Sequence, residues 1–239
     1  GMSAPGLDLQ VLELMDADKS IVRTSVNFMG CYAAIHALKM ADAFCKSDAT
    51  AKVLIVCTEL CTLHFQREHT ADNITSSLLF ADGAAAVLVT AGDKGGKGLH
   101  LENFYAEVVP KGKRDMAWEL SSTGFLMQLS GYVPDLIEED FEPVVARSLQ
   151  KSGWTKKDVS DWCIHPGGKR ILEAVQHSVG IEKEQLQASY DVLQQHGNMS
   201  SATILFVLKN LLQTKGARNI FGAAFGPGLT IETFTASVS

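Results

Sequence analysis

The stretch IVRTSVNFMGCYAAIHALKMADAFCKSDATAKVLIVC, residues 21–57, decides the expected fold. Residues 21–26 are rich in β-branched side chains and predict a strand. Residues 31–43 have the Ala, Leu and Met content of a buried helix, and residues 51–57 form an apolar run typical of a central strand. Strand, helix and strand at these lengths indicate a layered α/β fold with both sheet faces covered.

The same alternation continues along the rest of the chain. A Gly- and Lys-rich cluster at residues 91–98 interrupts it and is the best candidate for a linker. We therefore expect two similar α/β halves, residues 1–95 and residues 96–239, the first of them incomplete. The remaining periodic segments predict strands over 84–89, 99–109, 161–164 and 219–235, and helices over 76–80, 133–150, 170–179, 183–195 and 200–212.

Composition limits the possible partners. The 239 residues carry a formal net charge of −6 with scattered basic residues, which argues against a nucleic-acid partner. No apolar stretch reaches the length of a membrane span, and the first residues lack the pattern of a signal peptide. The five cysteines are odd in number and lack metal-ligand spacing, so we expect reduced thiols, no metal and a cytoplasmic protein.

Cys31 is the first candidate for chemistry. It follows Gly30, which permits a tight turn, at the point where a predicted strand leads into a predicted helix. A thiol at the positive end of a helix dipole is expected to have a lowered pKa and to be the most reactive of the five. A cysteine that only packs in the core is the alternative interpretation.

Three further loops carry motifs that contain a polar residue or a Gly-Pro-Gly sequence. His165 begins His-Pro-Gly-Gly at the end of a predicted strand, where sites usually form, although local backbone groups could equally satisfy it. Asn198 either caps the helix that follows or presents its amide to a developing oxyanion. Gly226-Pro227-Gly228 forms a rigid loop that a ligand can approach closely.

Taken together, Cys, His and Asn on separate loops form the constellation used for acyl transfer through a thioester. The order of Gly30-Cys31, His165 to Gly168, Gly197 to Ala202 and Phe225 to Thr230 resembles the type III polyketide synthases, the chalcone-synthase-like branch of the thiolase fold. The resemblance covers essentially the whole chain. Further stretches that fit are Ala4 to Asp8, which is similar to the family's interface loop, residues 56–60, residues 79–86, and residues 115–118 and 124–125, which look more like bacterial members.

The resemblance implies a fold, a reaction and a role for each motif. The fold would be a layered α-β-α-β-α arrangement of the thiolase type. The reaction would be a decarboxylative Claisen condensation of an acyl-CoA starter with malonyl-CoA, with Cys31 carrying the acyl chain and with His165 and Asn198 steering decarboxylation and holding the thioester oxygen. Coenzyme A thioesters would be substrates, with no further cofactor. The substrate-binding residues would be the gatekeeping Phe80 and Phe125, the loop Gly226, Pro227 and Gly228, and the basic Lys169 and Arg170.

The resemblance also bears on assembly. It implies a homodimer built around the first residues and the helix after Cys31. The family's usual chain has a long N-terminal stretch before the interface loop, which contributes strands and basic contacts to coenzyme A. Because this sequence begins at that loop, we expect the chain as given to be a poor synthase despite its intact Cys, His and Asn.

Several alternatives stay open at the level of sequence. A ketoacyl-ACP synthase of the initiating type also uses Cys, His and Asn, but His165-Pro166-Gly167-Gly168 and Gly226-Pro227-Gly228 argue against it. A thiolase needs a second catalytic cysteine near the C-terminus, and no cysteine follows Cys163. A truncated, non-catalytic thiolase-fold protein is the alternative from another class.

Overall fold

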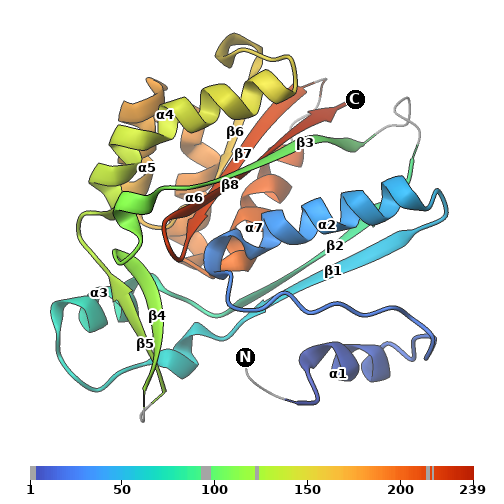
Figure 1. Ribbon diagram of the computed structural model, residues 1–239, viewed down its shortest axis with the longest axis horizontal. Coiled ribbons are helices and arrows are strands. Elements are labelled where there is room, and N and C mark those ends of the chain that lie inside the picture. The colour runs from blue at the N-terminus through green and yellow to red at the C-terminus, as the bar shows by residue number, and fades with distance from the viewer. Residues whose placement is uncertain (1–3, 93–97, 122–123, 214–215, 217) are drawn as a thin grey trace.

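A four-stranded mixed sheet lies at the centre of the second half of the chain (Figure 1). The computed structural model describes residues 4–92, 98–121, 124–213, 216 and 218–239, and all of their side chains except those of residues 120, 121, 125 and 129. The strand order is β3-β8-β7-β6, and only β6 and β7 run parallel. The strands are β3 (Leu99–Val108), β6 (Asp161–Ile164), β7 (Arg218–Gly226) and β8 (Thr230–Val238).

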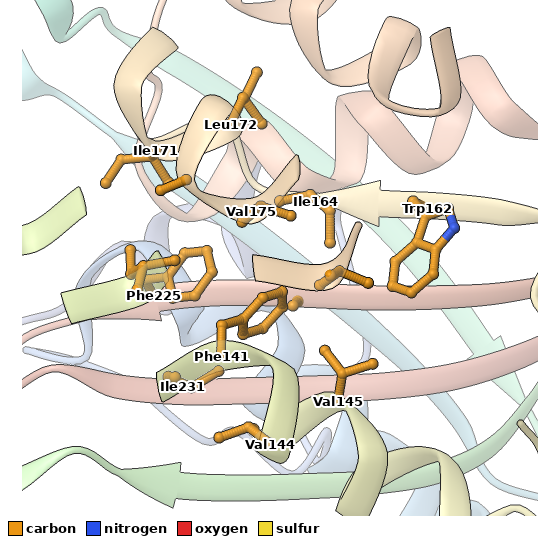
Figure 2. Close-up of a cluster of buried hydrophobic side chains, with 14 of the residues drawn as sticks. Phe141, Val144, Val145, Trp162, Ile164, Ile171, Leu172, Val175, Phe225 and Ile231 are labelled. Atoms are coloured by element: carbon orange, nitrogen blue, oxygen red, sulfur yellow. The ribbon is translucent and has the colours of Figure 1, made fainter. Parts of the chain in front are cut away.

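Two helices, α4 (Val133–Lys151) and α5 (Lys169–Val179), cover the outer face of this sheet (Figure 1). Figure 2 shows the apolar cluster between them and the strands. Phe141 of α4 meets Phe225 of β7 edge-on with ring centroids 5.2 Å apart, and the Trp162 and Phe221 rings are 5.3 Å apart. Each buried aromatic side chain of this kind contributes about 2–3 kcal/mol through removal from water, so this cluster anchors the second half.

The inner face of the sheet packs on a helical layer formed by α2 (Ala33–Ser47) and α7 (Ser201–Leu212). On the far side of this layer lie β1 (Lys52–Glu59) and β2 (Gly83–Thr90), an antiparallel pair (Figure 1). Every second residue of β1 and β2 is exposed, because only one face of the pair meets the helices. The layer order is therefore helix, sheet, helix, sheet.

The remaining elements surround these layers. They include a second hairpin, whose strands β4 and β5 pair antiparallel. Among the described residues, no helix is both long and apolar enough to cross a membrane. The bounds are α1 (Leu7–Leu14), α3 (Ala71–Leu79), β4 (Met116–Ser121), β5 (Gly124–Leu129), α6 (Gln187–His196) and the 3-10 turns Gly30–Tyr32, Cys61–His64, Pro110–Gly112, Lys156–Asp158 and Lys183–Leu186.

Two sequence-based expectations about the first half are wrong. Residues 21–26 form no strand, since no described strand pairs with them and nearly all of their side chains are exposed. The run at residues 51–57 is strand β1, but within the described part of the chain it pairs with β2 alone and is half exposed, so it is not a central strand. Residues 93–97 of the expected linker lie outside the described residues.

Candidate active site

Cys31 occupies a short 3-10 turn, Gly30–Tyr32, directly before α2. Gly30 has a φ of +63°, and a Cβ at this position would lie 2.7 Å from Cδ of Pro227. Gly226 packs equally closely on the Tyr32 ring. Because both contacts require the absence of a side chain, the turn that carries the thiol and the Gly-Pro-Gly loop interlock.

His165 follows the last residue of β6, as the sequence predicted. Its backbone N–H donates to the carbonyl of Ala223 at 2.8 Å, which extends the pairing of β6 with β7. The side chain is 1% exposed, and neither ring nitrogen has a hydrogen-bond partner. Burial lowers the pKa of His165 to about 3. At neutral pH the ring is therefore an uncharged imidazole with one nitrogen able to accept a proton.

Asn198 links three parts of the site. Its backbone forms a parallel bridge with Phe80, with hydrogen bonds to Leu79 and Ala81. The side-chain Oδ1 accepts the N–H of Ser200 at 2.9 Å, and Nδ2 donates to the carbonyl of Gly167 at 3.2 Å. The Asn198 side chain therefore does not cap α7, whose N-cap residue is Ser200. Instead, it ties the start of α7 to the loop that carries His165.

The environment of the thiol contradicts the expected low pKa. The Cys31 Sγ lies 3.7 Å from Oγ of Ser200. Burial raises the pKa of Cys31 to about 12, the nearby carboxylate of Glu59 adds to this, and hydrogen bonds with Ser200 and Asn198 oppose it. Loss of water around the sulfur outweighs the dipole of α2, which begins two residues later.

Other thiols of the chain are also harder to ionise than a free cysteine. Burial raises the pKa of Cys57 to about 11 and that of Cys61 to about 12, and it also raises the pKa of Cys163. All five cysteines are free, as expected. The pKa of Cys31 therefore gives it no advantage over the other thiols.

A cavity of about 2270 Å³ brings the candidate residues together. Cys31, His165 and Asn198, far apart in the sequence, all contribute to its wall. Gly228 lies just beyond the lining, in the turn after β7. The side chain of Phe125 is outside the described part of the chain, although its backbone belongs to β5. The other predicted substrate-binding residues also line the cavity, namely Phe80, Lys169, Arg170, Gly226 and Pro227.

Two family models match this chain. The N-terminal domain of "Chalcone and stilbene synthases" matches residues 1–93, and the C-terminal domain matches residues 100–238. The chain belongs to the chalcone and stilbene synthase family, the type III polyketide synthases. It is 32% identical to the "Alpha-pyrone synthesis polyketide synthase-like Pks18" of Mycobacterium tuberculosis over 241 residues, which is 97% of this chain and 61% of that protein. The chain thus spans about three-fifths of this relative.

Solved structures that are similar to this chain confirm the thiolase-like α/β fold. PKS-I from the brown alga Ectocarpus siliculosus superposes with a TM-score of 0.94 at 27% identity, over 100% of this chain and 66% of that one. The type III domain of Steely1 from Dictyostelium gives 0.93 at 30% identity, over 100% and 68%.

Sequence reasoning missed three residues around the thiol. Glu59, Ser200 and Ser201 lie within or next to family-like motifs, but no role was assigned to them. Ser200 contacts Cys31, and Ser201 donates to Glu59 through both its backbone and its hydroxyl. A carboxylate at the end of an apolar strand was the available signal, because a charge there needs a partner.

Proposed function

We propose that this chain forms the reaction centre of a type III polyketide synthase, which condenses an acyl-CoA starter with malonyl-CoA. The observation that carries the proposal is the shared cavity of Cys31, His165 and Asn198. A nucleophile, a neutral base and an amide donor on one wall are the groups that thioester chemistry needs. Membership of the family supports the same reaction class.

Loading is the first step. The Cys31 thiol gives its proton to the unpartnered imidazole of His165 as sulfur attacks the carbonyl of the acyl-CoA. The tetrahedral oxyanion accepts hydrogen bonds from the Asn198 amide and the imidazole. Collapse breaks the bond to the sulfur of coenzyme A, which takes the proton back from His165, so the free thiol leaves and the acyl chain stays on Cys31.

Extension is the second step. The carbon–carbon bond to the malonyl carboxylate breaks, carbon dioxide leaves, and the electron pair forms an enolate whose oxygen Asn198 and His165 stabilise. The enolate carbon then attacks the thioester on Cys31, and the carbon–sulfur bond breaks to release the thiolate. The burial of His165 and Asn198 strengthens these hydrogen bonds, which favours charge development on the substrate oxygen.

Coenzyme A thioesters are proposed as the substrates, without a further cofactor. Lys169 and Arg170 follow the His165 loop and line the cavity with side chains that are 74% and 64% exposed. Their present ion pairs with Glu173 and Asp135 are long, at 3.5 and 4.0 Å, and exposed, so phosphate groups can replace these partners at little cost. Phe80 contributes apolar lining for the acyl chain.

The proposal is tested by loading and turnover. The protein is incubated with a range of acyl-CoA starters, and intact-mass and peptide mapping locate the acyl group, which is expected on Cys31. Cys31→Ala should abolish loading, and Cys45→Ala, whose thiol does not line the cavity, should leave it unchanged. Products with malonyl-CoA are identified by mass, and His165→Gln should slow loading by roughly 10²–10⁴-fold. Absence of any adduct on Cys31 would favour a non-catalytic protein.

A further inference from the structure

The start of α7 has an unusual cap. A serine that begins a helix ordinarily accepts a hydrogen bond from an N–H of its own first turn. Ser200, the N-cap residue of α7, makes no such bond, and its backbone has a φ of 49° and a ψ of −126°. Its hydroxyl lies instead at the thiol of Cys31, with 3.7 Å between oxygen and sulfur.

Glu59, the last residue of β1, caps α7 in place of Ser200. Its Oε1 accepts the backbone N–H of Ser201 at 3.2 Å and also the Ser201 hydroxyl. A carboxylate in this position satisfies a free N–H of the first turn and interacts favourably with the helix dipole. A residue of strand β1 thus caps the helix, and the Ser200 hydroxyl is free to contact the Cys31 thiol.

The same bonds fix Asn198. The N–H of Ser200 donates to Oδ1 of Asn198 at 2.9 Å, and the backbone of Ser200 has a positive φ of 49°. A positive φ is unfavourable for serine, so surrounding contacts must hold it in place. The two hydrogen bonds that Ser201, the next residue, donates to Glu59 supply that restraint.

We propose that Glu59 is a positioning residue for the condensation site: by capping α7 in place of Ser200, it keeps the Ser200 hydroxyl on the Cys31 thiol and the Asn198 amide on the cavity wall. The importance for catalysis rests on the proposed synthase function. Where the protein turns over, Glu59→Ala should lower kcat by roughly 10–100-fold with little change in KM, because misplacement of a reacting group by about 1 Å has effects of this size.

Glu59 acts on the thiol in two opposing ways, and two variants separate them. Its charge disfavours the Cys31 thiolate, whereas the Ser200 hydroxyl that it positions favours the thiolate. Glu59→Gln removes the charge but keeps an amide oxygen that can accept from Ser201. Glu59→Ala removes both the charge and the cap, so the Ser200 bond to Cys31 should be lost as well.

The test is the rate of Cys31 alkylation by iodoacetamide at pH 8, located by peptide mapping. This rate follows the thiolate fraction, which changes tenfold for each unit of pKa. Glu59→Gln should react severalfold faster than the original protein, and Glu59→Ala at least threefold more slowly than Glu59→Gln. The difference should vanish when Ser200→Ala is added to both. Equal rates for Glu59→Ala and Glu59→Gln with Ser200 present would overturn the proposal.

Two further variants serve as a matched control and as a substitute for Glu59→Ala. Asp82→Asn is the matched control, since Asp82 accepts the N–H and hydroxyl of Thr62 at 2.8 and 2.7 Å as Glu59 does with Ser201, but away from α7. It should leave the rate at Cys31 unchanged. If Glu59→Ala does not fold, Ser201→Ala replaces it and should slow alkylation; an unchanged rate there would also contradict the proposal. Because alkylation needs no thioester, these results stand whether or not acyl loading succeeds.

Discussion

His165 is held in a state that favours chemistry over stability. A buried polar atom without a partner costs about 1–3 kcal/mol, and both ring nitrogens of His165 are in this condition. A thioester carbonyl or the Cys31 proton can satisfy them when substrate is present. The ring thus keeps a nitrogen free to accept a proton, and the cost is a lower free energy of unfolding.

The same burial predicts how stability changes with acid. The pKa of His165 falls from 6.5 to about 3 on folding, so below pH 6.5 the unfolded chain binds a proton that the folded protein does not. The contribution of this residue to the free energy of unfolding is therefore lost as pH falls, by at most about 1.4 kcal/mol per pH unit. Urea unfolding at several values between pH 6.5 and 4 measures it, and His165→Gln should show the shallower decline.

The comparison of the original protein with His165→Gln isolates the contribution of this one residue. A decline equally steep in the original protein and in His165→Gln would mean that His165 is not held neutral by burial.

At the scale of elements, the turn before α2 and the loop after β7 act as one unit. Gly30 approaches Pro227, and Gly226 approaches the Tyr32 ring, so neither segment can move without the other. The loop between β7 and β8 therefore fixes the position of the Cys31 thiol in the cavity wall. A contact of this kind depends on backbone geometry rather than on a polar side chain.

Gly30→Ala should destabilise the protein for two separable reasons. A left-handed residue with a Cβ costs about 1–2 kcal/mol, and the clash with Pro227 should add about 1–3 kcal/mol as the packing adjusts. Gly153→Ala is the matched control, because Gly153 has a φ of +68° and open space around it. Chemical denaturation of both variants gives the difference, and equal losses would mean that the contact with Pro227 carries no energy.

Most long elements were predictable because apolar residues recur in them with a clear helix or strand periodicity. The helix expected over 133–150 is α4 (Val133–Lys151), and the strand expected over 161–164 is β6. The hairpin β4–β5 was missed because the sequence between its strands lacks an Asn-Gly or Asp-Gly signal. The strand expected at residues 21–26 had the composition of a strand but has no partner strand among the described residues, and composition alone does not supply hydrogen bonds.

The site was predictable only in part. Motifs identified Cys31, His165 and Asn198 as candidates, and the fold brings all three to one cavity. The ionisation of the thiol was not predictable, because it depends on burial in the folded chain, on the charge of Glu59 and on a hydrogen bond with Ser200, and both residues are far from Cys31 in the sequence. The position of Cys31 just before a helix predicts that the helix dipole lowers its pKa. It does not reveal the burial that raises the pKa.

At the scale of the whole molecule, the two halves differ in how well they are enclosed. The second half is covered by α4 and α5 on one side and by α2 and α7 on the other, and most residues of β7 and β8 are buried. In the first half, large apolar side chains remain exposed on the described surface. Examples are Leu14 at 87%, Val22 at 88% and Phe28 at 67%. Val22 and Phe28 line the same cavity, and contiguous exposed apolar surface usually marks an interface.

We propose that a second copy of the chain covers this surface, around the first residues and α2. Ala33, Ala37, Met40 and Phe44 follow one another at helical spacing along the α2 face that lines the cavity, and Phe44 is 44% exposed. Light scattering should then give twice the mass of 25.8 kDa.

Phe44→Glu should raise the monomer fraction, because a charge on a buried apolar contact carries a large desolvation cost. Leu212→Glu is the matched control, since Leu212 is 40% exposed at the end of α7 and lies outside the cavity lining. A mass of one chain at every concentration, or equal effects of the two substitutions, would contradict pairing through α2.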